Sequence, residues 1–337
     1  MKLNRQWILR QRPDDDIGSG DLEFVQTPIP QISVGQMLIR NLYLSLDPTN
    51  RLWMSDRDQY LPPVKLGHVM RGSTIGIVEQ SLSEKFSPGD IVKLPDGGWQ
   101  DYAVVRDHMA EAVVEDPTVP LTAHLSVLGM TGLTAYGCLL DIGRPQAGET
   151  VVISAAAGAV GSIAGQIAKR QGCHVVGIAG GPQKCRWLTE DLGFDAAIDY
   201  KSQDVPTQLD ALCPNGIDVA FENVGGSIMD AIFSRLALHG RMAVCGLISG
   251  YNDSGPLAGP TDFGRILMKR LTVKGFIVID YLDRSDAAFA NLRQWITGGA
   301  LIWKDHIIDG LENAPDALNL LFNGKNDGKL MVRIASE

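Results

Sequence analysis

Apolar runs alternate with amphipathic stretches through the second half of the chain. Residues 151–153 form a short β-branched run, which is typical of a buried parallel strand. A turn of glycine and alanine follows, and residues 160–171 then carry Val160, Ile163 and Ile167 on one helical face. The same alternation predicts further strands at 175–178, 196–198, 217–221, 242–245 and 271–278, and helices at 183–192, 203–212 and 227–236. Strands and helices in this order predict an α/β fold, a doubly wound parallel sheet covered on both faces.

The first part of the chain follows a different pattern. Short strand-like runs separated by glycine and proline predict strands at 37–44, 74–78, 91–94 and 102–105. After about residue 300, two more strand-like runs, 301–308 and 328–334, flank a helical stretch at 314–322. We therefore predict a β-rich, barrel-like domain formed by residues 1–124 and 300–337, and an α/β domain over residues 125–299.

Charge and cysteine content narrow the classes of partner and compartment. The 337 residues include 30 Lys and Arg against 39 Asp and Glu, a net charge of −9. Nucleic acids and anionic membranes select clustered positive charge, so we expect neither as a partner. The five cysteines include no C-x-x-C spacing, and an odd number suits a reducing compartment. The amino terminus lacks the apolar stretch of a secretory signal, and the uncharged run 151–168 is too short and too polar for a membrane span, so we expect a soluble cytoplasmic protein.

The turn after the first α/β strand has the spacing of a dinucleotide-binding loop. Ala156, Gly158 and Gly161 fit G-x-G-x-x-G with alanine in the first place, and Val160 lies inside the motif. Gly158 would let the backbone approach a pyrophosphate, and Gly161 would let the helix pack closely on the strand. The alternative is a core helix that is merely rich in alanine and glycine. The strand before the motif and the helix after it favour nucleotide binding.

The end of the next strand indicates which dinucleotide binds. NAD sites usually place an acidic residue about 20 residues further on, where it bonds the ribose hydroxyls. Here the strand ends at Gly180 without an acid, and Lys184 and Arg186 follow. A missing carboxylate beside a cation favours a 2′-phosphate and hence NADP(H). The alternative for Lys184 is a solvated lysine at the start of a helix.

Several segments along the chain resemble those of one enzyme family. They are 44–48 (LSLDP) with Arg51, 130–136 (MTGLTAY), 155–161, 221–226 (FENVGG), 245–252 (CGLISGYN), 276–278 (FIV) and 326–329 (NDGK). In these segments the chain is similar to the zinc-independent medium-chain dehydrogenases/reductases, and within them to the NADPH-dependent alkenal/one reductases. The resemblance implies a GroES-like β-barrel domain with a Rossmann domain. It also implies a homodimer that pairs the edges of two Rossmann sheets.

The resemblance also implies roles for individual residues. Lys184 and Tyr200 would hold the 2′-phosphate, and Asn223 and Asn326 would contact the cofactor. The nicotinamide half would be lined by Cys245, Gly246 and Leu247 and by Phe276, Ile277 and Val278. Tyr251 would lie over the substrate carbonyl as the catalytic residue, with Tyr60 as a wall of the substrate pocket. Thr49 and Asn50 would face the substrate entrance, and many relatives carry Tyr-Met or Ala-Met there, so the substrate itself is not carried over.

One histidine raises the question of a zinc site. The sequence Gly67-His68-Val69-Met70-Arg71-Gly72 is similar to the G-H-E-x-x-G of zinc alcohol dehydrogenases, but Val69 replaces the glutamate. No cysteine precedes residue 138, and a catalytic zinc needs three protein ligands. We therefore expect His68 to be a loop histidine and the protein to bind no metal.

Without a metal, hydride chemistry needs a substrate that is already activated by conjugation. NADPH would deliver hydride to the β-carbon of an α,β-unsaturated ketone or aldehyde, and Tyr251 or a ribose hydroxyl would stabilise the enolate. Two other functions stay open: an NADPH quinone oxidoreductase with the same cofactor site, and a catalytically silent, crystallin-like nucleotide-binding protein.

Overall fold

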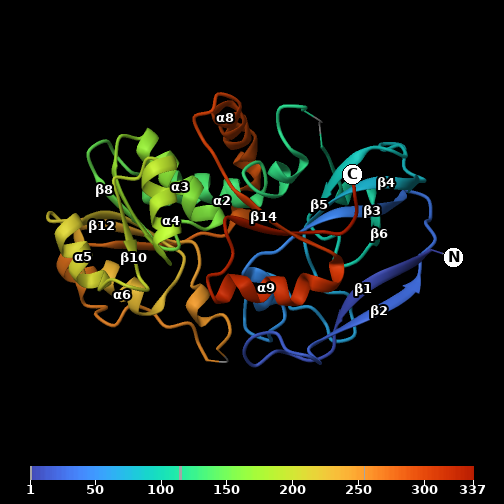
Figure 1. The fold of residues 1–337 in the computed structure, drawn as a ribbon, viewed down its shortest axis with the longest axis horizontal. Coiled ribbons are helices and arrows are strands. Elements are labelled where there is room, and N and C mark those ends of the chain that lie inside the picture. The colour runs from blue at the N-terminus through green and yellow to red at the C-terminus, as the bar shows by residue number, and fades with distance from the viewer. Residues whose placement is uncertain (1, 114–115, 254) are drawn as a thin grey trace. The chain divides into compact units, whose positions relative to one another are not determined.

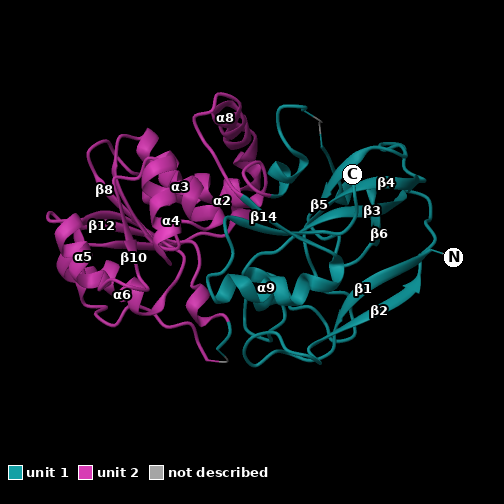
Figure 2. Ribbon diagram, in the orientation of Figure 1, with its two compact units in different colours: residues 1–125, 252–254, 305–337 teal, residues 126–251, 255–304 magenta. Residues whose placement is uncertain are grey.

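The chain divides into two compact units, each described here by itself (Figures 1 and 2). The structure is a computed structural model that describes residues 2–113, 116–253 and 255–337. Unit 1 comprises Met1–Leu125, Asn252–Ser254 and Asp305–Glu337, and unit 2 comprises Ser126–Tyr251 and Gly255–Lys304. The short return to unit 1 directly after Tyr251 has no counterpart in the domain boundaries expected from the sequence.

Unit 2 is built on a six-stranded parallel sheet of order β10-β9-β8-β11-β12-β13. The strands are β8 Thr150–Ile153, β9 His174–Ala179, β10 Ala196–Asp199, β11 Ile217–Glu222, β12 Leu236–Val244 and β13 Thr272–Gly275. The strand order reverses between β8 and β11, which is the topological switch point where such sheets bind ligands. The predicted parallel α/β sheet is confirmed.

Helices pack along the sheet, and most of them bury apolar residues. They are α2 Met130–Gly137, α3 Ala159–Arg170, α4 Pro182–Arg186, α5 Val205–Leu212, α6 Gly226–Phe233, α7 Arg265–Lys269 and α8 Ser285–Thr297. Of these, α4 and α7 have no buried residue. Leu209 of α5 and Ile232 of α6 pack against Val152, Val176 and other sheet residues in one core. The helices α2, α3 and α8 pack together, and α3 also contacts β8 and β9. No helix among the described residues is long and apolar enough to cross a membrane.

Unit 1 is β-rich, as predicted. Its larger sheet has the order β14-β15-β3-β4-β5-β7 with β6 also on β3, and β1 and β2 form an antiparallel pair. The strands are β1 Leu3–Leu9, β2 Leu22–Pro28, β3 Gln36–Ser45, β4 Thr74–Ser81, β5 Ile91–Leu94, β6 Tyr102–Arg106, β7 Glu111–Ala112, β14 Asp305–Asp309 and β15 Lys329–Arg333, and the helices are α1 Thr49–Trp53 and α9 Ala314–Phe322. Because β15 pairs with β3, the carboxy-terminal segment is part of this unit (Figure 2).

Several elements differ from the sequence prediction, among them a helix end, a helix type and a strand start. The helix expected to reach Leu236 ends at Phe233, because Leu236 pairs with Ile217 and starts β12 instead. The helix expected over 183–192 stays α-helical only to Arg186 and continues as a π-helix, Trp187–Asp191.

The strand expected over 301–308 is the third of these differences. It begins only at Asp305, because the backbone N–H and C=O of Ile302 both bond the side chain of Gln166, at 2.9 and 2.8 Å. An amide side chain thus replaces the neighbouring strand that this apolar run would otherwise need.

Candidate functional site

The predicted cofactor residues of unit 2 share one position in the fold. Each follows the carboxyl end of a strand of the parallel sheet: Gly158 after β8, Gly180 after β9, Tyr200 after β10, Asn223 after β11, Cys245 after β12 and Phe276 after β13. The carboxyl ends of parallel strands meet at one edge of a sheet. The fold therefore gathers residues that are far apart in the sequence at this edge, with the switch point between β8 and β11.

The dinucleotide loop is shaped by close backbone contacts. A Cβ atom on Gly161 would lie 2.5 Å from the carbonyl oxygen of Ala155, and one on Gly158 would lie 3.1 Å from it. Ala155 itself adopts a φ of 47°, and the N–H of Ala156 bonds the carbonyl of Ile178 at 2.9 Å. The loop leads directly into the N-terminus of α3, whose first N–H groups favour an anion. These features fit a bound pyrophosphate.

A second cluster gathers where β9 and β10 end. Tyr200 donates its N–H to the carbonyl of Ala179 at 3.1 Å, and its ring lies 2.9 Å from where a Cβ of Gly180 would be. Asp199 accepts hydrogen bonds from the N–H groups of Gly181 (2.7 Å) and Lys201 (3.1 Å). Burial would raise the pKa of Asp199, but these bonds hold it below its usual range. The carboxylate therefore fixes the turn, and nothing in this arrangement commits it to a ribose.

Two lysines flank this cluster. Lys184, the predicted phosphate ligand, is half-buried on α4, which begins two residues after Gly180. Lys201, which sequence analysis did not single out, is exposed, and its Cε lies 3.0 Å from where a Cβ of Gly180 would be. Its position directly after Tyr200 was the signal that could have found it. The cluster thus offers positive charge beside a glycine, which suits a phosphate better than a ribose hydroxyl.

Asn223 joins the ends of the two strands at the switch point. Its backbone N–H donates to Ser154 Oγ and its side-chain Nδ2 donates to the Ser154 carbonyl, both at 2.7 Å. Ser154 directly follows β8. The side chain of Asn223 is therefore held beside the dinucleotide loop, and its contact with the cofactor stays a prediction.

The loop after β12 folds back on its own tyrosine. The N–H of Leu247 donates to the Tyr251 hydroxyl oxygen at 3.1 Å, and that oxygen lies 3.2 Å from where a Cβ of Gly246 would be. A hydroxyl that accepts a hydrogen bond becomes a stronger donor through its own proton. Tyr251 thus lies against the residues predicted to line the nicotinamide.

The segment after β13, residues 276–278, is held in place by one backbone hydrogen bond and by the packing of its side chains. Phe276 donates its N–H to Val244 at 3.0 Å, and its ring packs 5.8 Å from that of Tyr281. Phe276 and Val278 both pack against a small apolar cluster, while Ile277 is extended and half-buried. These contacts fix the backbone of 276–278 at the sheet edge.

The predicted substrate residues lie in unit 1. Two of them, Thr49 and Asn50, are neighbours on α1 but have different surroundings. Thr49 Oγ1 hydrogen-bonds the hydroxyl of Tyr60, whose pKa is raised mainly by burial. Asn50 is only 1% exposed, and its amide accepts from the N–H of Asp47 at 2.7 Å and donates to the Arg71 carbonyl at 3.3 Å. Asn50 therefore anchors the backbone, and its contact with a substrate stays a prediction.

An ion pair between a buried lysine and a partly exposed aspartate joins two of the resemblance segments within unit 1. Lys329, 2% exposed, pairs with Asp47 and also donates to the Leu46 carbonyl at 3.1 Å. Asn326 closes the turn before it by donating to the Gly328 carbonyl at 3.0 Å. The cofactor contact predicted for Asn326 stays a prediction, and the ion pair ties the two segments together in the fold.

The most buried acid of the sheet edge was missed. Glu222, the last residue of β11, is 0% exposed, and burial raises its pKa to about 7. In the sequence Glu222 is only one residue of the 221–226 segment, because an acid beside asparagine after a strand is expected in solvent.

His68 lies in the turn after Gly67, and its Nδ1 is 3.3 Å from the carbonyl oxygen of Leu66. Among the residues that the structure describes, no three His, Cys, Asp or Glu side chains group as metal ligands would.

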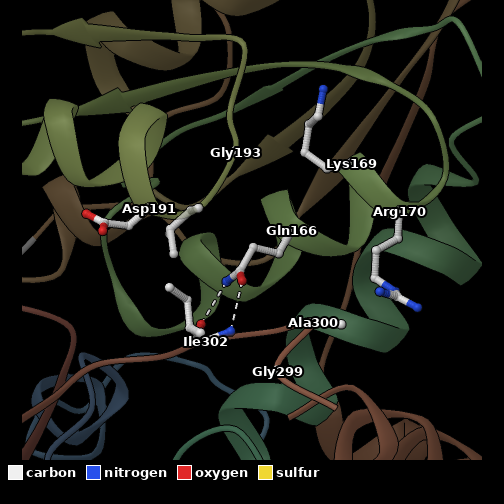
Figure 3. A pocket seen from close by; sticks show the side chains of 9 residues that line it. Gln166, Lys169, Arg170, Asp191, Gly193, Gly299, Ala300 and Ile302 are labelled. Carbon is white, nitrogen blue, oxygen red and sulfur yellow. Dashed lines mark hydrogen bonds between the residues drawn. The ribbon is translucent and has the colours of Figure 1, made fainter.

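A hollow of about 330 Å³ in unit 2 lies away from this edge (Figure 3). It is lined by Lys169 and Arg170 at the carboxyl end of α3, whereas the dinucleotide loop precedes the amino end. Lys169 pairs with Asp195 at 2.7 Å, Arg170 stacks on Trp295, and Gln166 bonds Ile302. These polar groups already have partners, so the hollow does not extend the site.

Two protein families match the chain. The family described as the N-terminal domain of oxidoreductase matches residues 5–113, and the family described as zinc-binding dehydrogenase matches residues 159–297.

Individual proteins match over nearly the whole chain. NADPH-dependent curcumin reductase of Escherichia coli (strain K12) is 42% identical over 99% of this chain and 98% of its own length. Prostaglandin reductase 1 of Bos taurus is 36% identical over 98% of both. The crystal structure of CurA from Vibrio vulnificus in complex with NADPH is 43% identical, with a TM-score of 0.93 over 99% of this chain and 100% of that one. The Escherichia coli quinone oxidoreductase complexed with NADPH, at 20% identity and a TM-score of 0.76 over 98% and 99%, shares the fold alone.

Proposed function

The chain belongs to the zinc-independent medium-chain dehydrogenases/reductases, in the branch of NADPH-dependent alkenal and enone reductases, and we infer from this that it reduces the carbon–carbon double bond of α,β-unsaturated ketones and aldehydes. The observation that carries the inference is the sheet edge, where a phosphate-compatible loop and a tyrosine hydroxyl follow strands of one sheet.

The residues present fit NADPH. The Gly158–Gly161 loop would hold the pyrophosphate, and Lys184 with Tyr200 would hold the 2′-phosphate, with Lys201 beside them. Asn223, the 245–247 backbone and the 276–278 backbone would hold the nicotinamide half. When bound, NADPH supplies a hydride to the β-carbon of the conjugated substrate.

Tyr251 is the proposed catalytic residue. Hydride addition leaves negative charge on the substrate oxygen, and a hydroxyl donor there lowers the barrier. The Leu247 N–H holds the tyrosine oxygen at 3.1 Å and strengthens its proton as a donor. Water then completes protonation at the α-carbon. We propose Thr49 and Tyr60, which are hydrogen-bonded to each other, as substrate contacts.

A panel of substrates tests the function. We expect NADPH oxidation with an enone and none with the matching saturated ketone. With NADPH deuterated at the transferred position, the label should appear on the β-carbon by NMR. Turnover of a quinone alone would favour the quinone oxidoreductase instead, and cofactor binding without turnover of either would favour the crystallin-like protein.

We also propose a homodimer and a cytoplasmic location. The edge strand β13 is exposed along its length, and Leu267 and Met268 on the nearby α7 are exposed apolar residues. An exposed strand edge beside apolar side chains favours pairing with a second copy. All five cysteines are free thiols, which suits a reducing compartment. Light scattering should give twice the mass of one chain, and Val273→Asp on β13 should give a monomer.

A further inference from the structure

Glu222 combines complete burial with an incomplete set of hydrogen bonds. Its Oε1 accepts the N–H groups of Val224 and Gly225, at 2.6 and 2.7 Å. Its Oε2 is also buried and has no hydrogen-bond partner among the described residues. A buried carboxyl group held in this way costs stability.

The carboxyl group closes the turn that begins α6. Gly225 and Gly226 have φ values of 84° and 56°, and the sharp turn aims the N–H groups of 224 and 225 inward. Without Glu222 Oε1, these two donors would lose their partner. The same turn carries Asn223, whose amide is fixed on Ser154.

The loop that bears Tyr251 rests on the same short segment. The Glu222 carbonyl accepts the N–H groups of Cys245 (2.8 Å) and Gly246 (3.1 Å). The two residues after Glu222 accept from the next part of the loop, with Ile248 N–H on the carbonyl of 223 at 3.1 Å and Ser249 N–H on that of 224 at 2.9 Å. The position of the 245–251 loop is therefore set by residues 222–224.

We propose that Glu222 is a positioning residue for the nicotinamide half of the cofactor site, acting through Asn223 and the 245–251 loop without touching the cofactor. The proposal rests on the assignment of this sheet edge to NADPH. It does not depend on which substrate is reduced.

No charge of opposite sign compensates the carboxyl group. Its contacts are backbone N–H groups and the Ser154 hydroxyl, and the titratable side chains of the adjoining loop are Cys245 and Tyr251. Along the strands, Arg241 pairs with Glu149 at 2.5 Å and Asp218 accepts from the N–H of Thr150, both toward the amino ends. Since Oε1 can accept both N–H groups in either protonation state, the amide oxygen of a glutamine can replace it.

The experiment compares two ligands by calorimetry. NADPH spans the whole site, whereas adenosine 2′,5′-bisphosphate carries the 2′-phosphate and adenosine but no nicotinamide. For Glu222→Ala we expect NADPH to bind about 10- to 100-fold more weakly, the loss of one or two buried hydrogen bonds. The bisphosphate should bind within twofold of wild type, and Glu222→Gln should bind both ligands nearly as wild type does.

A matched control removes a carboxylate from the other end of the same sheet. Glu149→Gln loses the charge that pairs with Arg241 and should leave both affinities unchanged. If Glu222→Ala does not fold, Glu222→Asp, one methylene shorter, should weaken NADPH about three- to tenfold with no change for the bisphosphate.

Equal losses for both ligands, or unchanged NADPH binding in Glu222→Ala or Glu222→Asp, would overturn the proposal. Because the readout is binding, an enzyme that binds NADPH but reduces no enone would refute the proposed function and leave this proposal standing.

Discussion

The side chains of the candidate site have two expected roles: contact with the cofactor or substrate, or support of the backbone around it. From their positions after β9 and β12, we expect Lys184 and Tyr251 to be of the first kind. Asp199, Asn50 and Glu222 belong to the second, because their oxygens accept backbone N–H groups nearby. The first kind should affect ligand selectivity or rate, and the second should affect geometry and stability.

Lys184→Ala should weaken NADPH far more than NADH. A charge-assisted contact with the 2′-phosphate is worth about 1.5–3 kcal/mol, or about 10- to 100-fold in Kd, and the effect should shrink as salt rises. Titration of both cofactors measures the ratio, with the exposed Lys85→Ala of unit 1 as the control. Equal losses for NADPH and NADH would remove Lys184 from the phosphate site.

Tyr251→Phe should lower kcat on an enone by about 10- to 100-fold while NADPH affinity hardly changes, since a bond that strengthens in the transition state is lost. A ribose hydroxyl can substitute in part, so activity should persist. Steady-state kinetics gives kcat and kcat/KM. Tyr136→Phe is the control, because its hydroxyl also accepts one hydrogen bond, from Asn291, but on α2. Normal kcat in Tyr251→Phe would leave the proton donor to water or the cofactor.

At the scale of elements, the hydrophobic periodicity was sufficient to predict the bounds of a helix or strand that buries one face. Residues 314–322 form α9 with the predicted bounds, and β5 matches likewise. The prediction of secondary structure failed where a residue distant in the sequence decides which structure forms. Leu236 has helical spacing but pairs with Ile217, and the 301–304 run is bonded by Gln166 instead of a strand.

The residues of the candidate site divide in the same way, into those marked by local sequence spacing and those defined by distant partners. Gly158 and Gly161 could be predicted because the loop has a spacing of its own. Lys201 had a signal only in its position directly after Tyr200, and Glu222 had none, because only the burial of the end of β11 sets its surroundings.

The packing of α3 on the dinucleotide loop gives a prediction at this scale. In Gly161→Ala the new methyl group would meet the Ala155 oxygen at 2.5 Å and the Ala156 Cα at 2.9 Å, both backbone atoms that cannot rotate away. We expect a destabilisation of about 1–3 kcal/mol and weaker NADPH binding. Thermal melts and titrations measure both. Gly259→Ala, where no atom lies within 4 Å of the new carbon, should change neither, and a normal Gly161→Ala would show that the loop tolerates the shift.

For the whole molecule, Glu222 should make stability fall as pH rises. Its pKa is about 7 when folded, against 4.5 as the usual value, so the folded state binds more protons between these values. Stability is unaffected below about pH 4.5, declines through the window, and has lost about 3 kcal/mol above pH 7.

Glu222→Gln lacks this titration. Urea unfolding at pH 5 and pH 8.5 should therefore show wild type losing stability relative to Glu222→Gln as the pH rises. Parallel pH profiles for the two proteins would show that the carboxyl group does not titrate in this range.

The reversal of strand order between β8 and β11 separates the two tasks of the cofactor site. The groups expected at the 2′-phosphate follow β9 and β10, on one side of β8, and those expected at the nicotinamide follow β11, β12 and β13, on the other. If these assignments hold, the preference for one coenzyme over another is set by different loops from those at the nicotinamide. Changing the loops after β9 and β10 should therefore shift the preference toward another coenzyme, such as NADH, while the loops at the nicotinamide stay as they are. The sheet supports both sets of loops, so either set can be replaced without the other.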